Sequence, residues 1–131
     1  RPSREAWHEA AARDERMIEL LRRRGIDGIV GGYWMAYPVN FLSRERILAV
    51  PCSFDYYNYR GHRPPGHLYH WALVSSRPPE LAAWAAKTGV SGSLVLVAPD
   101  HAVFLLANNP SAPAAQEQLL DRLQASCTLM D

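Results

Sequence analysis

The sequence of 131 residues lacks several features that would place it in a functional class at once. It has only two cysteines, Cys52 and Cys127, and no CxxC pair, which excludes a cysteine-based zinc knuckle. It has no apolar run of about 20 residues, the length that spans a membrane, and no signal peptide. The two cysteines leave two alternatives open: one disulfide in an oxidising compartment, or two buried free thiols that behave as small apolar groups.

The sequence also has little excess charge of either sign. Fourteen Lys and Arg residues face 13 Asp and Glu residues, for a formal net charge of +1. No basic run with interleaved aromatic residues occurs, so we expect no nucleic-acid partner. The basic cluster at positions 22–24 falls where a helix is expected to end, and there it complements the helix dipole.

Length and composition predict a single domain over residues 1–131. The chain is long enough to bury a sizeable core, and 48% of its residues are hydrophobic, as is usual for a globular domain. Because the sequence opens on Arg1 and not on Met, we expect it to be part of a longer protein.

The stretch from Gly28 to Pro51 organises the chain. Residues 28–32 predict a short buried strand that runs into a glycine turn. Aromatic residues then recur at spacings of one, three and four, which indicates a short helix with its rings on one side. Pro38 is expected in the first turn of that helix, where its missing N–H has no helical partner. Residues 43–46, three of which are charged, are expected to end the helix, and residues 47–50 predict the next strand.

The remaining elements follow from periodicity and from helix signals. Residues 4–24 predict an amphipathic helix capped by Ser3 and ended by Gly25, with Trp7 on its apolar side. Residues 69–75 predict a strand, and residues 76–89 predict a helix. Two apolar runs, 93–98 and 102–107, predict a hairpin. A last helix is expected from about residue 112, with Ser111 or Asn109 as its cap.

This order of elements predicts the fold class. Strands that alternate with helices favour an α/β fold with a mixed, mainly parallel sheet of about five strands. Helices are expected on both faces of the sheet, and the hairpin is expected as an antiparallel edge.

The segment 52–68 is predicted to be a long loop that is rich in rings and cations. Long loops in small domains are usually functional, and tyrosine and arginine combine contact area with directional hydrogen bonds. The residues that we expect to bind a ligand are Tyr56, Tyr57, Tyr59, Arg60, His62 and Arg63.

No catalytic, metal-binding or cofactor-binding residue is predicted. The spacing of His62, His67 and His70 matches no common zinc pattern. A trio of Ser53, His101 and Asp100 lacks a nucleophile-elbow signature. The glycines near residue 28 surround a strand instead of following one into a helix, so they do not form a dinucleotide-binding motif.

The central stretch resembles one protein family. Tyr33-Trp34-Met35-Ala36-Tyr37, Phe41-Leu42-Ser43, Glu45-Arg46 and Val50-Pro51 are similar to a segment in the soluble tail of bacterial multi-spanning glycosyltransferases of the protein-mannosyltransferase type, which use a polyprenyl-phosphate-linked sugar. Two positions depart from that pattern. Gly32 stands where an acidic residue is expected, and Arg44 stands where a glycine is expected. The family-motif residues here are Tyr33, Trp34, Tyr37, Phe41, Glu45 and Arg46.

The resemblance implies a non-catalytic accessory domain on the extracytoplasmic side of a bacterial inner membrane. Its expected partners are the membrane portion of the same polypeptide and a glycan acceptor or polyprenyl-phosphate sugar. Two alternatives stay open. One is a small stand-alone hydrolase or metal enzyme that uses His62, His67 and His70. The other is a protein-interaction domain whose partner docks near Trp34 and Phe41.

Overall fold

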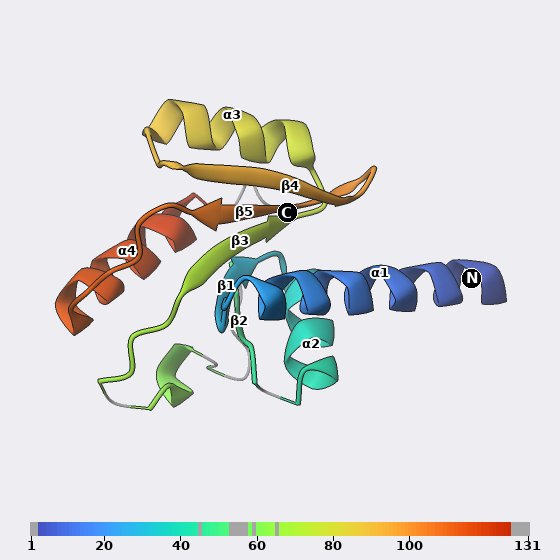
Figure 1. The fold of residues 1–131 in the computed structure, drawn as a ribbon, viewed down its shortest axis with the longest axis horizontal. Helices are drawn as coiled ribbons and strands as arrows, with labels where there is room; N and C mark the ends of the chain where they lie inside the picture. Colours follow the sequence, from blue (N-terminus) through green and yellow to red (C-terminus); the bar gives the residue numbers. More distant parts are fainter. Residues whose placement is uncertain (1–2, 45, 53–57, 59, 65, 127–131) are drawn as a thin grey trace.

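The structure is a computed structural model, and it describes residues 3–44, 46–52, 58, 60–64 and 66–126. It confirms the predicted α/β class (Figure 1). The elements in chain order are α1 (Arg4–Arg23), β1 (Gly28–Gly31), α2 (Tyr33–Leu42), β2 (Leu48–Pro51), the 3₁₀ turn η1 (Arg60–His62), β3 (Trp71–Ser75), α3 (Pro78–Thr88), β4 (Gly92–Ala98), β5 (His101–Leu106) and α4 (Pro113–Ala125).

The described strands form one mixed sheet in the order β2-β1-β3-β5-β4. β1 lies between β2 and β3 and is parallel to both. β5 is antiparallel to β3, and β4 is antiparallel to β5 at the far edge. The predicted edge hairpin is therefore confirmed, and β2 and β4 are the two edge strands.

Helices cover both faces of the sheet, and each face has its own hydrophobic cluster. On one face, α1 and α2 contribute Met17, Leu21 and Val39, which pack on alternate residues of the strands. On the other face, α3 and α4 contribute side chains such as Trp84 and Leu120. Successive strand residues point to opposite faces, so β1, β2, β3 and β5 each supply both clusters, whereas the edge strand β4 packs against the cluster beneath α1 and α2 alone.

Two glycines let β3 lie close to β1. A Cβ on Gly28 would come within 2.8 Å of the Trp71 ring, and a Cβ on Gly31 would overlap the side chain of Val74. These glycines are therefore required by packing against the neighbouring strand. Glycine also ends α1 and α3, as the sequence predicts, because Gly25 and Gly89 both have φ of +69°.

Three local predictions differ from the structure. Trp7 is 63% exposed, because the first half of α1 extends beyond the sheet and has no strand beneath it (Figure 1). Pro38 lies in the middle of α2, not in its first turn. The N-cap of α4 is Ala112, without a side-chain hydrogen bond. The Asn109 side chain instead accepts a hydrogen bond from the backbone N–H of Trp71 at 2.6 Å.

The structure decides between the two cysteine alternatives in favour of a disulfide. Cys52 is disulfide-bonded, and it is buried beside the end of β2. The other cysteine in the sequence, Cys127, lies outside the described residues. None of the helices that the structure describes is both long enough and apolar enough to cross a membrane.

Candidate functional site

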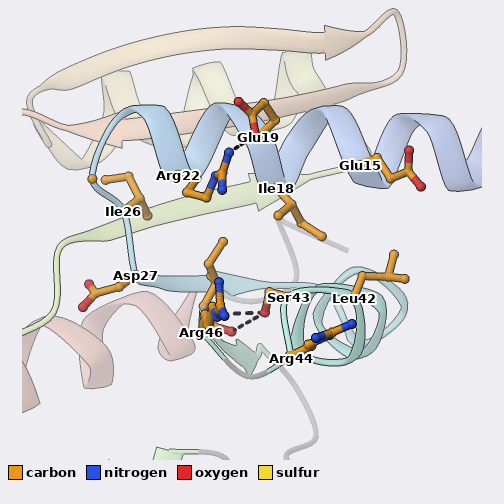
Figure 2. Close-up of a pocket in the computed structure, with 12 residues that line it drawn as sticks. Glu15, Ile18, Glu19, Arg22, Ile26, Asp27, Leu42, Ser43, Arg44 and Arg46 are labelled. Carbon is orange, nitrogen blue, oxygen red and sulfur yellow. Dashed lines mark hydrogen bonds and ion pairs between the residues drawn. The ribbon is translucent and has the colours of Figure 1, made fainter.

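A groove with a volume of about 620 Å³ lies between the second half of α1 and the turn that follows α2 (Figure 2). We call it the α1–α2 groove. Four of its residues come from α1, three from the turn between α1 and β1, and the others from the end of α2 with the following turn. The lining residues are Glu15, Ile18, Glu19, Arg22, Gly25, Ile26, Asp27, Leu42, Ser43, Arg44, Arg46 and Ile47.

Two buried polar side chains hold the α2 wall of the groove in place. The Asn40 amide donates to the carbonyl oxygen of Ala49 and accepts from the Ala49 N–H, both at 2.8 Å. The Ser43 hydroxyl donates to the Ile47 carbonyl at 3.3 Å and accepts from the Ile47 N–H at 3.2 Å. The two Asn40 bonds fasten α2 to the edge strand β2, and the two Ser43 bonds close the turn between them, so the groove has a defined wall.

The interior of the groove is apolar. Ile26 and Ile47 are buried members of the cluster beneath α1 and α2, and Ile18 packs against that cluster from α1. Leu42 stays partly exposed at the outer rim. An apolar interior with a few polar groups around it is the usual composition of a ligand site.

The charged residues of the groove differ in whether they are already paired. Arg22 donates to Glu19 at 2.9 Å, and Glu19 also accepts from Arg23 at 3.1 Å. In contrast, the guanidinium groups of Arg44 and Arg46 have no hydrogen-bond or ion-pair partner among the described residues. Both arginines lie on the turn below α1 (Figure 2). Within the described part of the chain, one wall of the groove therefore has two cations without a partner.

The two remaining acids of the groove are Asp27 and Glu15. The Asp27 carboxylate points away from the cavity and is used elsewhere. It accepts from the His70 backbone N–H at 2.8 Å and lies 3.0 Å from the His67 ring nitrogen Nε2. Glu15 lies on exposed helix surface at the far end of the groove from Arg46 (Figure 2). It is thus the single groove acid without a described partner.

Arg44 has an unusual backbone conformation. Its φ is +54°, in the left-handed region that glycine or asparagine normally fills at the end of a helix. A residue with a side chain at such a φ costs about 1 kcal/mol in stability.

The predicted ligand-binding loop is only partly described. Tyr56, Tyr57 and Tyr59 lie outside the described residues, and His62 is described only through its backbone in η1. Arg60 and Arg63 are both engaged by α4. Arg60 donates to Glu117 at 2.8 Å and to Asp121 at 2.7 Å, and Arg63 donates to the other oxygen of Glu117.

These contacts join the loop to α4 as one charged network. Hydrogen bonds from Arg60, and then from Arg63, lower the pKa of the Glu117 carboxyl below its usual value. The described contacts of the two arginines therefore tie the loop to the helix. The cavity beside them measures only about 170 Å³.

The family-motif residues do not gather at one place. Tyr33, Trp34 and Tyr37 lie in α2, and their side chains are outside the description. Phe41 is 82% exposed on α2. Glu45 is outside the described residues, and only Arg46 lines the α1–α2 groove.

The histidines with described side-chain partners bind different acids and do not form one cluster. His67 pairs with Asp27, and His101 pairs with Asp100 through Nδ1 at 2.8 Å. The hydrogen bond from His101 lowers the pKa of Asp100. Within the described parts of the chain, no group of three His, Cys, Asp or Glu side chains could hold a metal ion.

Sequence reasoning missed two buried polar residues that hold elements together, Asn40 and Gln116. The Gln116 side-chain oxygen accepts from the Tyr69 N–H at 2.8 Å and from the Trp71 indole N–H at 2.9 Å. Its amide nitrogen donates to the carbonyl of His67 at 3.1 Å. The available signal was a polar amide on the apolar side of a predicted helix, because each amide bonds to residues of another element: Asn40 to Ala49 of β2, and Gln116 to residues more than 40 positions away.

Comparisons with protein-family models, with curated proteins and with solved structures found no match to this chain.

Proposed function

We propose that this chain is a binding and positioning domain that serves a membrane glycosyltransferase-like protein on the extracytoplasmic side. In this role it would hold a glycan acceptor or a lipid-linked sugar donor, while bond-making takes place in the membrane portion of the same polypeptide. No catalytic residue is assigned to the domain.

One observation carries the proposal. The segment that resembles the glycosyltransferase tails, Gly25 to Pro51, supplies most of the residues that line the α1–α2 groove. The resemblance depends on residue identities, whereas the groove is defined by geometry. Their coincidence supports a binding role for this segment.

The disulfide at Cys52 supports the proposed compartment. Disulfides persist in oxidising environments and are rare in the cytosol of most organisms. The exposed first half of α1, with Trp7 on its surface, offers a face to the membrane portion of the polypeptide.

The proposal is tested by binding. The chain is passed over nanodiscs that contain a polyprenyl-phosphate sugar and over otherwise identical nanodiscs without it, and it is also applied to a glycan array. We expect binding that depends on the sugar lipid or on one glycan class. Equal binding to both kinds of nanodisc, together with no binding to any glycan on the array, would refute the proposal.

A second candidate, a protein-interaction domain, is favoured by the exposure of the last turn of α2. Phe41 is 82% exposed and Leu42 is 43% exposed, and both are large apolar side chains. A Phe41→Ser variant that keeps sugar-lipid binding but no longer associates with the membrane portion would favour this candidate.

A further inference from the structure

We propose that the α1–α2 groove binds an amphipathic anion: a phosphate or carboxylate group held by Arg44 and Arg46, with an apolar arm lying along Ile18, Ile26 and Ile47. This inference rests on the proposed function, because it names the ligand chemistry of the same groove.

The dimensions of the groove fit such a ligand. A volume of about 620 Å³ is within the range of small-molecule sites, which run from about 300 to 1,000 Å³. The groove is bounded by α1 above and by the turn after α2 below (Figure 2). An arm of several methylene groups would cover Ile18 and Leu42, the apolar lining side chains that keep contact with water, above the buried Ile26 and Ile47.

The charge distribution fixes where the anionic group lies. Guanidinium groups bind phosphate and carboxylate through paired N–H donors. Arg44 and Arg46 keep those donors unpaired among the described residues, whereas Arg22 is already bonded to Glu19. The anion therefore belongs at the turn after α2.

The acidic residues of the groove are compatible with an anion at the turn after α2. Glu19 is compensated by Arg22 and Arg23, and Asp27 is bonded to His70 and paired with His67. Glu15 remains, and it disfavours a second negative charge at the far end of the ligand. The expected ligand thus has one charged end and one neutral end.

The backbone conformation of Arg44 also supports a binding role for its side chain. A left-handed φ of +54° favours glycine, yet this position has a long cationic side chain at the rim of a cavity. Backbone strain of this kind concentrates at binding sites, where the side chain is needed for function.

The test uses the 131-residue chain and four soluble probes: octyl phosphate, octanoate, inorganic phosphate and octyl glucoside. Isothermal titration calorimetry is carried out on the wild type, on Arg44→Gln/Arg46→Gln and on the control Arg4→Gln, which removes an exposed arginine of α1 outside the groove. We expect octyl phosphate or octanoate to bind the wild type and the control equally. Binding to the double variant should be at least about tenfold weaker, as expected for the loss of one or two charge-assisted bonds.

The other probes separate the two parts of the ligand. Octyl glucoside has the arm without the charge, and inorganic phosphate has the charge without the arm, so both should bind more weakly than octyl phosphate. A preference between octyl phosphate and octanoate identifies the anionic group. Equal binding of octyl phosphate to the wild type and the double variant, or equal binding of all four probes, would overturn the inference.

Failure of this inference is distinguishable from failure of the proposed function. Binding to sugar-lipid nanodiscs without binding of octyl phosphate or octanoate removes the groove assignment and leaves the proposed function standing. Octyl phosphate binding that depends on Arg44 and Arg46, without nanodisc or glycan binding, supports the groove and removes the proposed function.

Discussion

Asn40 of α2 satisfies both backbone groups of Ala49 on the outer side of edge strand β2, with two hydrogen bonds of 2.8 Å. The Asn40 carboxamide has the same donor and acceptor groups as a peptide unit, so it forms the two hydrogen bonds that a neighbouring strand would otherwise form with Ala49. The edge of β2 is thereby closed to pairing with another chain at this residue.

Replacing Asn40 by alanine should destabilise the protein by about 2–4 kcal/mol, because two buried backbone groups lose their partners. Urea unfolding followed by circular dichroism measures this change. Gln118→Ala, which removes an exposed amide from α4, is the control and should change stability by less than about 0.5 kcal/mol. Similar values for the two variants would mean that the Asn40 bonds contribute nothing to stability.

Arg44→Gly should make the protein more stable by about 1 kcal/mol, because glycine adopts the left-handed φ of this position without strain. For a chain of this size the midpoint of thermal unfolding should rise by about 4 °C. Asn58→Gly is the control, since Asn58 has a φ of +52° but asparagine tolerates it. Its effect should be smaller, and an Arg44→Gly variant with lowered stability would contradict the assignment of strain. The same Arg44→Gly protein should bind octyl phosphate or octanoate less tightly.

The pairing of Glu117 with Arg60 and Arg63 should make stability depend on pH. Because the pKa of Glu117 is lowered in the folded protein from its ordinary value of 4.5, folding favours the ionised carboxyl. The stabilisation is complete above that ordinary value and is lost as the pH falls through the folded pKa. Glu117→Gln should therefore be less stable than the wild type at pH 7, and the difference should shrink at pH 3.

The measurement is the urea midpoint of both proteins at the two pH values. Glu9→Gln, a change in an exposed acid of α1, serves as the control and should have little effect at either pH. A difference between wild type and Glu117→Gln that is the same at pH 7 and pH 3 would show that the charge of Glu117 is not involved.

Reduction of the disulfide at Cys52 should lower stability by about 2–4 kcal/mol. Cys52 is buried in the cluster beneath α3 and α4, and Gln124 of α4 donates to the neighbouring Pro51 carbonyl at 3.3 Å. Thermal unfolding with and without a phosphine reductant measures the effect. A Cys52→Ala protein should not respond to the reductant, and a wild type that does not respond either would rule out a stabilising disulfide.

The sequence predicted those parts of the fold that depend on local signals. Gly25 and Gly89 end their helices, Ser3 caps α1 through the Ala6 N–H at 3.1 Å, and the hairpin of β4 and β5 follows from two apolar runs with a short turn. Each of these depends on residues within a few positions of one another.

Predictions that depend on distant residues were less successful. Asn109 was expected to cap α4, but its oxygen accepts from Trp71, which is remote in sequence. Trp7 was placed on the apolar face of α1 by periodicity, and periodicity does not reveal that the sheet ends before that part of the helix. Similarly, the groove needs α1 and the turn after α2 to meet, so no single segment could reveal it.

The position of β1, β3 and β5 inside the sheet sets the order in which backbone amides exchange with deuterium. Each of these strands has a neighbour on both sides and is buried along its whole length. Their amide hydrogens can reach solvent only when the whole domain opens, whereas β2 and β4 have an outer side and should exchange through smaller openings. In hydrogen-exchange mass spectrometry, peptides that cover β1, β3 and β5 should therefore take up deuterium last and at the rate of global unfolding.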